Sequence, residues 1–286
     1  MASFDSFGLG AGDGPDSPPA SPVVISVPHA GREYPPELLA ALRVPAAALT
    51  VLEDRHLDAV AYLARGGEAM LVQRRGRAWI DLNRSEDERD PRVDDGALAG
   101  PPATSSAKLR SGLGLVPRRA GAAGDLWRRR FTDAEVAARI AGDHRPYHAA
   151  LAATLAAAGD RFGVAVLVDL HSMPPLGATG ARVVVGDRFG RSAGDRFAAR
   201  ALAVAAATGH RAGLNAPYAG AHILDRHGRP GEGIHALQIE LDRSLYLDAR
   251  LDRPGPGLAA TATLVTRLIA ALADEALAGE RRLAAE

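Results

Sequence analysis

The stretch VAVLVDLH at residues 164–171 is short, rich in β-branched side chains and almost continuously apolar up to its histidine. VVISVPH at residues 23–29 repeats this pattern near the start of the chain. Such runs are typical of strands buried on both faces of a parallel sheet. Ligands of open α/β sheets gather at the carboxyl ends of the strands. We therefore expect His29 and His171 to converge there, a geometry that suggests a metal site.

Strand-like and helical runs alternate along the rest of the chain. The sequence predicts strands near residues 22–28, 69–73, 77–82, 164–170, 182–186 and 235–241. It predicts helices near residues 36–42, 51–65, 132–158, 191–207 and 257–279. This alternation is typical of an α/β fold in which helices cover both faces of a mostly parallel sheet.

Composition excludes several classes of protein. The 286 residues include 34 basic and 34 acidic ones, so no net charge attracts nucleic acid or an acidic membrane. There is no cysteine, which excludes disulfides and thiolate sites and leaves histidine and carboxylate as metal ligands. No apolar run reaches the roughly 18 residues that a membrane helix needs. The absence of a secretion signal predicts a cytoplasmic protein.

The chain is long enough for one large domain or two small ones. We predict a disordered arm over residues 1–21, which are rich in Gly, Pro, Ser and Asp, and a single α/β domain over residues 22–286. Within it, residues 85–126 combine acids, Pro and Gly with a basic tract. A loop of this length covers a substrate or is a flexible insertion. Nucleic-acid binding is disfavoured because no aromatic side chains are interleaved with the arginines.

A catalytic zinc site takes three protein ligands, and two imidazoles with one carboxylate would suffice. The acidic pair Glu53–Asp54 offers that carboxylate. The two residues lie about 100° apart around a helix, so only one of them can face an ion, and the sequence favours neither. Asp54 could instead face the amino end of the helix that follows it. Asp169 shares a sheet face with His171 and could orient its ring or form a salt bridge.

Three further segments carry polar residues suited to catalysis or binding. Glu240 alternates with apolar neighbours in a predicted strand, where it could act as a general base or form a buried salt bridge. Asn83-Arg84 follows another predicted strand, and Arg84 could bind a substrate carboxylate or pair with a nearby acid. The segment at 215–226 could be a lid or a substrate wall, with Asn215, Tyr218 and Arg226.

Six short segments occur in a characteristic order: VPHAG (27–31), DRHLD (54–58), IDLNR (80–84), RPYH (145–148), DLHS (169–172) and HALQIE (235–240). Together they closely resemble the N-formylglutamate amidohydrolase (deformylase) family, over roughly residues 22–275. The resemblance implies a phosphorylase/hydrolase-like three-layer α/β/α sandwich with a mixed, mostly parallel sheet, related to zinc carboxypeptidases and aspartoacylases. It also implies a metal-dependent enzyme of histidine degradation that converts N-formyl-L-glutamate to L-glutamate and formate.

The resemblance also implies roles for particular residues. The metal ligands would be His29, Asp54 and His171, and Glu240 would be the general base. Zinc is the expected ion, and cobalt and manganese suit the same donors. Asn83 and Arg84 resemble the pair with which zinc carboxypeptidases hold a substrate carboxylate, and Arg145 and Arg226 are weaker candidates.

One segment departs from the family pattern. Typical members carry an Arg and a Lys where residues 215–220 here read NAPYAG. The resemblance therefore indicates the metal chemistry more closely than the acyl group or the amino acid. The alternatives are hydrolysis of another N-acyl amino acid or small peptide, and a non-catalytic protein that binds a metal or an amino acid. The expected partner is a small-molecule N-acyl amino acid, with no nucleic acid or membrane, and no oligomeric state is predicted.

Overall fold

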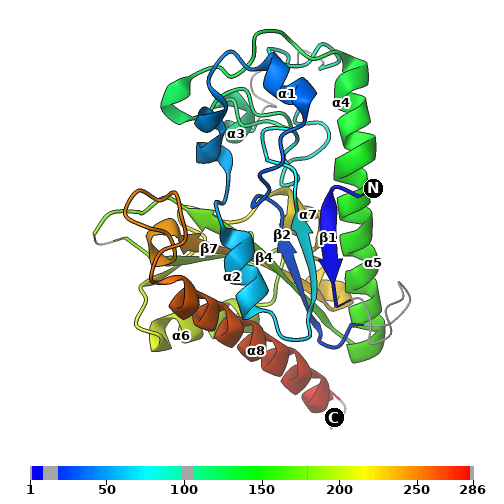
Figure 1. Ribbon diagram of the computed structural model, residues 1–286. Helices are drawn as coiled ribbons and strands as arrows, with labels where there is room; N and C mark the ends of the chain where they lie inside the picture. The colour runs from blue at the N-terminus through cyan, green and yellow to red at the C-terminus, as the bar shows by residue number, and fades with distance from the viewer. Residues whose placement is uncertain (1, 9–18, 98–105, 179, 284–286) are drawn as a thin grey trace. The chain divides into compact units, whose positions relative to one another are not determined.

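The computed structural model describes residues 2–8, 19–97, 106–178 and 180–283 (Figure 1). The chain forms two compact units. The sheet unit comprises residues 6–27, 54–72 and 150–286, and the loop-rich unit comprises residues 1–5, 28–53 and 73–149. Two compact units are compatible with a single domain, so the predicted domain over residues 22–286 stays a prediction.

A mixed seven-stranded sheet, built from the described residues, is the centre of the sheet unit. Its strands are β1 (Phe4–Phe7), β2 (Val23–Val27), β3 (Ala69–Gln73), β4 (Ala165–Met173), β5 (Val183–Gly186), β6 (Ala212–Leu214) and β7 (Ile234–Asp242). Their order across the sheet is β1-β3-β2-β4-β7-β5-β6. The pairs β2–β3, β2–β4, β4–β7 and β5–β6 are parallel, and only β5–β7 is antiparallel among the pairs with a defined register. The predicted mixed, mostly parallel sheet is confirmed.

The central strands are buried along their whole length, as their continuous apolar sequences predict. Every residue of β2, β3, β4 and β5 is buried. Burying one Val or Leu side chain contributes about 1.5–3 kcal/mol. Polar side chains in the same strands must therefore find partners, and Asp169 in β4 accepts a 2.8 Å hydrogen bond from Ser26 Oγ of β2.

Helices pack against this sheet to give the predicted α/β/α sandwich. Here α8 (Leu258–Leu283) contacts α2 (Leu57–Ala64), α6 (Asp195–Ala207), β2 and β4 (Figure 1). The short α7 (His222–His227) packs on β4 and β7. The buried side chains of α8 recur at helical spacing, with Leu264, Leu268 and Leu272 among them. No helix among the described residues has the length and apolar character needed to cross a membrane.

The loop-rich unit has short helices and much irregular chain. Its helices are α1 (Pro36–Ala41), α3 (Ala107–Arg110), α4 (Asp133–Arg139), the first residues of α5 (Arg145–Phe162), and the 3-10 helices Ala46–Leu52 and Gly121–Ala123. Short 3-10 helices in the sheet unit are Pro230–Glu232 and Arg243–Leu245. A capping box starts α4, because the Thr132 hydroxyl accepts from the Glu135 amide while the Glu135 carboxylate accepts from the Thr132 amide.

Several predicted elements differ from those observed. The run at 77–82 is buried but forms turns, because the Asp81 amide donates to Leu115 O and the Arg84 amide to Asp81 O, and no strand ladder forms. The predicted helix 51–65 is interrupted, since His56 has a left-handed φ of 58° immediately before α2. The predicted helix 132–158 contains a π-helical turn, Ile140–His144, between α4 and α5.

The amino-terminal stretch also differs from its prediction. Within the predicted disordered arm of residues 1–21, Phe4–Phe7 form an edge strand of the sheet. Phe7 packs its ring edge-on against Tyr62 with centroids 5.5 Å apart. Residues 9–18 of this arm, and residues 98–105 of the predicted loop, lie outside the described residues.

Candidate active site

In the sheet unit, two carboxylates hold the ring of His171. His171 Nε2 lies 2.8 Å from Asp169 Oδ2, and Nδ1 lies 3.1 Å from Asp54 Oδ2. All three side chains are buried. Burial alone would lower the pKa of His171, but the charges and hydrogen bonds of Asp169 and Asp54 outweigh it and hold that pKa well above its ordinary value. Asp169 therefore orients the ring, and Nδ1 faces Asp54.

The break between the 3-10 helix and α2 brings Asp54 to this position. Its other oxygen, Oδ1, accepts from Arg243 Nη2 and Ser172 Oγ, both at 3.2 Å. Arg243 directly follows β7. Sequence reasoning missed Arg243, and its position at the carboxyl end of the strand that carries Glu240 is the signal that could have revealed it. The Arg243 contact fixes one carboxylate oxygen and leaves the other toward His171.

Glu240 lies opposite His171 across a parallel pair of strands. The two residues are register partners of β7 and β4, so their side chains leave the sheet on the same face. Glu240 is 7% exposed and accepts a 2.9 Å hydrogen bond from Gln238 Nε2, as the predicted alternation of β7 requires. A carboxylate next to an imidazole and a second carboxylate is a suitable arrangement for moving protons.

The charges of Glu240, Asp54 and Arg243 also act on the phenol of Tyr218. Burial raises the pKa of Tyr218, and the negative charges of Glu240 and Asp54 raise it further against the opposing charge of Arg243. Tyr218 therefore keeps its proton at neutral pH and can donate a hydrogen bond. The sheet unit thus brings together four of the predicted site residues, Asp54, His171, Glu240 and Tyr218.

In the loop-rich unit, His29 is held by a carboxylate that the sequence reasoning did not single out. His29 Nε2 lies 2.7 Å from Asp81 Oδ1, and both residues are buried. Burial alone would raise the pKa of Asp81, but the charges of Arg77, Arg84 and His29 hold that pKa well below its ordinary value. Because an ionised Asp81 can only accept, Nε2 of His29 carries a proton and donates this hydrogen bond.

Asn83 and Arg84 are buried beside this pair. Arg84 Nε donates to Leu113 O at 2.8 Å and Nη1 donates to Asn83 O, while Asp81 Oδ2 lies 3.7 Å from Nε. Burial lowers the pKa of Arg84. The residue is buried, and the hydrogen bonds to Leu113 O and Asn83 O satisfy two of its donors within the unit. Its role in holding a substrate carboxylate stays a prediction.

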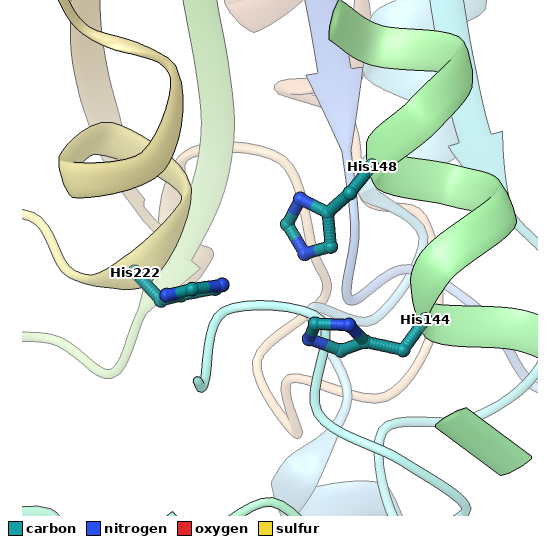
Figure 2. A group of neighbouring side chains, drawn as sticks. All are labelled: His144, His148 and His222. Carbon is teal, nitrogen blue, oxygen red and sulfur yellow. The ribbon is translucent and has the colours of Figure 1, made fainter. Parts of the chain in front are cut away.

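Two histidines hold the backbone of this segment in place. His144 Nε2 bonds to Arg84 O at 2.8 Å, and His148 Nε2 bonds to Leu82 O at 2.9 Å. Their rings lie on successive turns with centroids 4.4 Å apart (Figure 2). His222, which Figure 2 also labels, begins α7 in the sheet unit. His148 of the RPYH segment (145–148) therefore supports the backbone at Leu82, and His144 just ahead of that segment supports Arg84.

The remaining predicted residues have local roles or none that the structure shows. Arg145 is exposed and pairs with Glu86 at 2.7 Å. Asn215 has a φ of 58°, and its side chain accepts from the amide of Asp187 and donates to the Asp187 carboxylate. Arg226 is exposed on α7. Of the acidic pair at 53–54, Asp54 contacts His171, whereas Glu53 accepts a hydrogen bond from Tyr34.

Comparison with known proteins gives one consistent result. The sequence profile of the family described as N-formylglutamate amidohydrolase matches residues 21–247. The N-formylglutamate deformylase of Pseudomonas aeruginosa is 33% identical over 238 residues, which cover 79% of this chain and 82% of that protein. The N-formylglutamate deformylase of Pseudomonas putida is 32% identical over 234 residues, with the same coverage of 79% and 82%.

Solved structures agree with the sequence comparison. The crystal structure of N-formylglutamate amidohydrolase from Ralstonia eutropha JMP134 superposes with a TM-score of 0.85 at 31% identity, covering 98% of this chain and 100% of that one. The gene product Atu2144 from Agrobacterium tumefaciens shares the fold, with a TM-score of 0.60 at 17% identity over 98% of this chain and 95% of that one.

Proposed function

Because this chain belongs to the N-formylglutamate amidohydrolase family, we propose that it hydrolyses the N-formyl bond of N-formyl-L-glutamate to give formate and L-glutamate. The observation that carries the proposal is the Asp169–His171–Asp54 chain with Glu240 as the register partner of His171. Two Pseudomonas relatives named for this activity support the substrate. The roles in histidine degradation and in the cytoplasm stay predictions from the sequence.

We propose that His29, Asp54 and His171 hold one divalent ion, zinc in the first instance. The donor chemistry fits. His171 Nδ1 and Asp54 Oδ2 lie 3.1 Å apart, near the spacing of about 3.4 Å between two ligands bound at about 2.1 Å in a tetrahedral site. Carboxylates fix the other ring nitrogens of both histidines, which is the usual surrounding of metal-binding imidazoles.

Chain connectivity supports His29 as the third ligand. Only Pro28 separates it from Val27, the last residue of β2. Two residues of chain span at most about 7 Å, so the backbone of His29 stays close to the carboxyl end of β2. Since β2 pairs with β4 through Ser26 and Asp169, that end borders the strand that carries His171.

When bound, such an ion polarises a carbonyl and makes a water molecule more acidic. The reaction then depends on this chain's own acid and base. Glu240 takes a proton from the water molecule while the water oxygen attacks the formyl carbon. Glu240 then gives this proton to the amine that leaves. Tyr218 donates a hydrogen bond to the carbonyl oxygen as that oxygen gains negative charge. Arg243 and Ser172 hold the Asp54 carboxylate throughout.

A substrate with two carboxylates needs cationic or hydrogen-bond-donating partners, and we keep the arginines Arg84, Arg145 and Arg226 and the amides of Asn83 and Asn215 as candidates. Residues 215–220 lack the Arg and Lys of typical family members. This departure favours, as the second candidate function, hydrolysis of a different N-acyl amino acid or a small peptide by the same residues. A panel of N-formyl and N-acetyl amino acids, assayed with added zinc and with chelator, separates these substrates. A flat panel with metal bound would favour a non-catalytic binding protein.

Replacing the proposed base tests the mechanism. Glu240→Gln keeps the carbonyl that accepts from Gln238, so we expect the metal content and the melting temperature to be unchanged. Loss of the general base should lower kcat about 10²–10⁴-fold. Glu232→Gln is the matched control, because that exposed residue of the same unit pairs only with Arg229 among the described residues. Turnover of Glu240→Gln near that of the control would remove Glu240 from the mechanism.

A further inference from the structure

A cleft of about 210 Å³ in the loop-rich unit is lined mainly by arginines. Its walls come from three chain segments, namely the chain after α1, residues 92–93, and residues 118–130 ahead of α4. The lining arginines are Arg43, Arg92, Arg118, Arg128, Arg129 and Arg130. A single acid, Asp125, faces them. None of the residues proposed above for catalysis lines this arginine cleft.

Carboxylates neutralise only half of these arginines. The ion pairs are Arg118 with Asp90 and Asp125, Arg129 with Glu135, and Arg130 with Asp95. Arg43, Arg92 and Arg128 have no acidic partner among the residues that the structure describes. The cleft therefore has an excess of positive charge that its own side chains do not balance.

Backbone hydrogen bonds hold the three unbalanced arginines in place. The Arg43 amide donates to Leu126 O at 2.8 Å, and the Arg128 amide donates to Ala41 O at 2.9 Å. These two bonds pair the segments that carry Arg43 and Arg128. The Arg92 amide donates to the Asp90 carboxylate at 2.9 Å. Guanidinium groups on fixed backbones lose less freedom when they bind an anion.

A further positive charge lies near Trp127, the aromatic residue that lines the cleft. Arg139 is 2% exposed, and its guanidinium carbon lies 4.0 Å from the ring centroids of both Trp79 and Phe131. The Phe131 ring is 5.0 Å from that of Trp127, which lines the cleft. Burial lowers the pKa of Arg139 to about 10, so it remains charged at neutral pH. A buried charge is poorly screened and adds to the potential in the cleft.

From this arrangement we propose that the arginine cleft binds the phosphate group of a small molecule, either free phosphate or a phosphate monoester. A phosphate carries up to two charges on three or four acceptor oxygens, so it can accept hydrogen bonds from arginines that line one cleft from separate segments. A single carboxylate has one charge and two oxygens in a plane. The volume of about 210 Å³ holds a phosphate with a small substituent.

The cleft does not suit single-stranded nucleic acid. Such binding needs exposed aromatic faces on which bases stack. Trp127 is 7% exposed, its Nε1 donates to Pro117 O, and its ring packs against Phe131. Trp127 is therefore too buried to offer a stacking face, and the positive charge suits a compact anion.

Calorimetric titration of the full chain with inorganic phosphate and with glycerol 3-phosphate, at constant ionic strength, tests this proposal. We expect wild type to bind both. Arg43→Gln and Arg92→Gln should each weaken binding about tenfold, the usual effect of losing one charge-assisted hydrogen bond. Both side chains are exposed, so neither change should unfold the protein. Arg267→Gln, an exposed arginine of α8 in the sheet unit, is the matched control and should bind as wild type does.

The outcomes are distinct. Tighter binding of the ester would identify phosphate esters as the source, and tighter binding of phosphate would identify the free anion, and both support the proposal. Equal phosphate affinity in wild type and the Arg43→Gln, Arg92→Gln double variant would overturn it, because the anion would then bind elsewhere, for example at a metal. Absence of binding by wild type, or tighter binding of citrate than of either phosphate, would also overturn it.

Discussion

Replacing Asp81 by asparagine tests whether one buried carboxylate both stabilises the loop-rich unit and orients His29. Asp81 is 0% exposed. Its Oδ1 accepts from His29 Nε2 at 2.7 Å and from the Asn83 amide at 2.9 Å, and its Oδ2 accepts from Arg77 Nε at 2.8 Å. An asparagine has one oxygen and one NH₂ group. In either orientation of the asparagine amide, its NH₂ group faces a hydrogen-bond donor, either Arg77 Nε or the pair of His29 Nε2 and the Asn83 amide.

The expected loss of stability follows from these contacts. Asp81→Asn removes the charge that balances Arg77, which is 18% exposed, and Arg84, which is 4% exposed. Leaving a buried charge without its partner costs about 3–5 kcal/mol. Asp81 is ionised in the folded state even in mild acid, because its pKa is held well below the ordinary 3.8. Its contribution is therefore complete above pH 3.8 and lost as the pH falls further, so variant and wild type should converge in acid.

Urea unfolding at pH 7 measures this loss, with both proteins stripped of metal so that binding does not contribute. Asp274→Asn on the exposed side of α8 is the control and should stay within about 0.5 kcal/mol of wild type. In metal-loaded protein, Asp81→Asn should also weaken zinc binding about 10–100-fold, because Nε2 of His29 loses its partner. A loss of stability below about 1 kcal/mol would refute the electrostatic account of this residue.

Two further predictions concern Asp169 and Glu135. Asp169→Asn should weaken zinc binding about 10–100-fold, measured by competition with a chelator, since Asp169 orients His171 through a 2.8 Å bond; unchanged affinity would contradict that role. The Arg129 hydrogen bond lowers the pKa of Glu135 from 4.5 to about 2. Above pH 4.5, the melting temperature of wild type should therefore exceed that of Glu135→Gln. By pH 3, this difference should fall below about half of its value at neutral pH. A difference that does not change with pH would show that the charge of Glu135 is not involved.

The sheet, and the position of the candidate site at the carboxyl ends of β4 and β7, could be predicted because both depend on local sequence. Continuous apolar runs predict β2 and β4, and the histidine that follows or ends each run is visible without any structure. Alternation in β7 correctly paired Gln238 with Glu240 on one face. These features depend on side-chain periodicity, which the sequence shows directly.

Features that depend on distant partners could not be predicted. Residues 78–82 are as buried as a strand, but the Trp79 amide bonds locally to Gly76 O and the Asp81 amide bonds to Leu115 O, far along the chain. Asp81 and Arg243 gain their importance from His29 and Asp54, which lie 52 and 189 residues away in sequence. The arginine cleft was not predicted either, because Arg43 joins Arg92 and Arg128 only after the chain folds.

The π-helical turn Ile140–His144 holds one residue more than an α-helical turn would, and its wider winding keeps α4 and α5 in phase. Deleting the exposed Gly142 would let the backbone relax to ordinary α geometry, and because the turn loses only its extra residue, Val136 and Arg139 would keep their buried side. Deleting one residue from the α-helical part of α4 or α5 would instead rotate the positions on its two sides by about 100° relative to each other. A deletion scan across α4 and α5 should therefore find this turn more tolerant than the helix on either side.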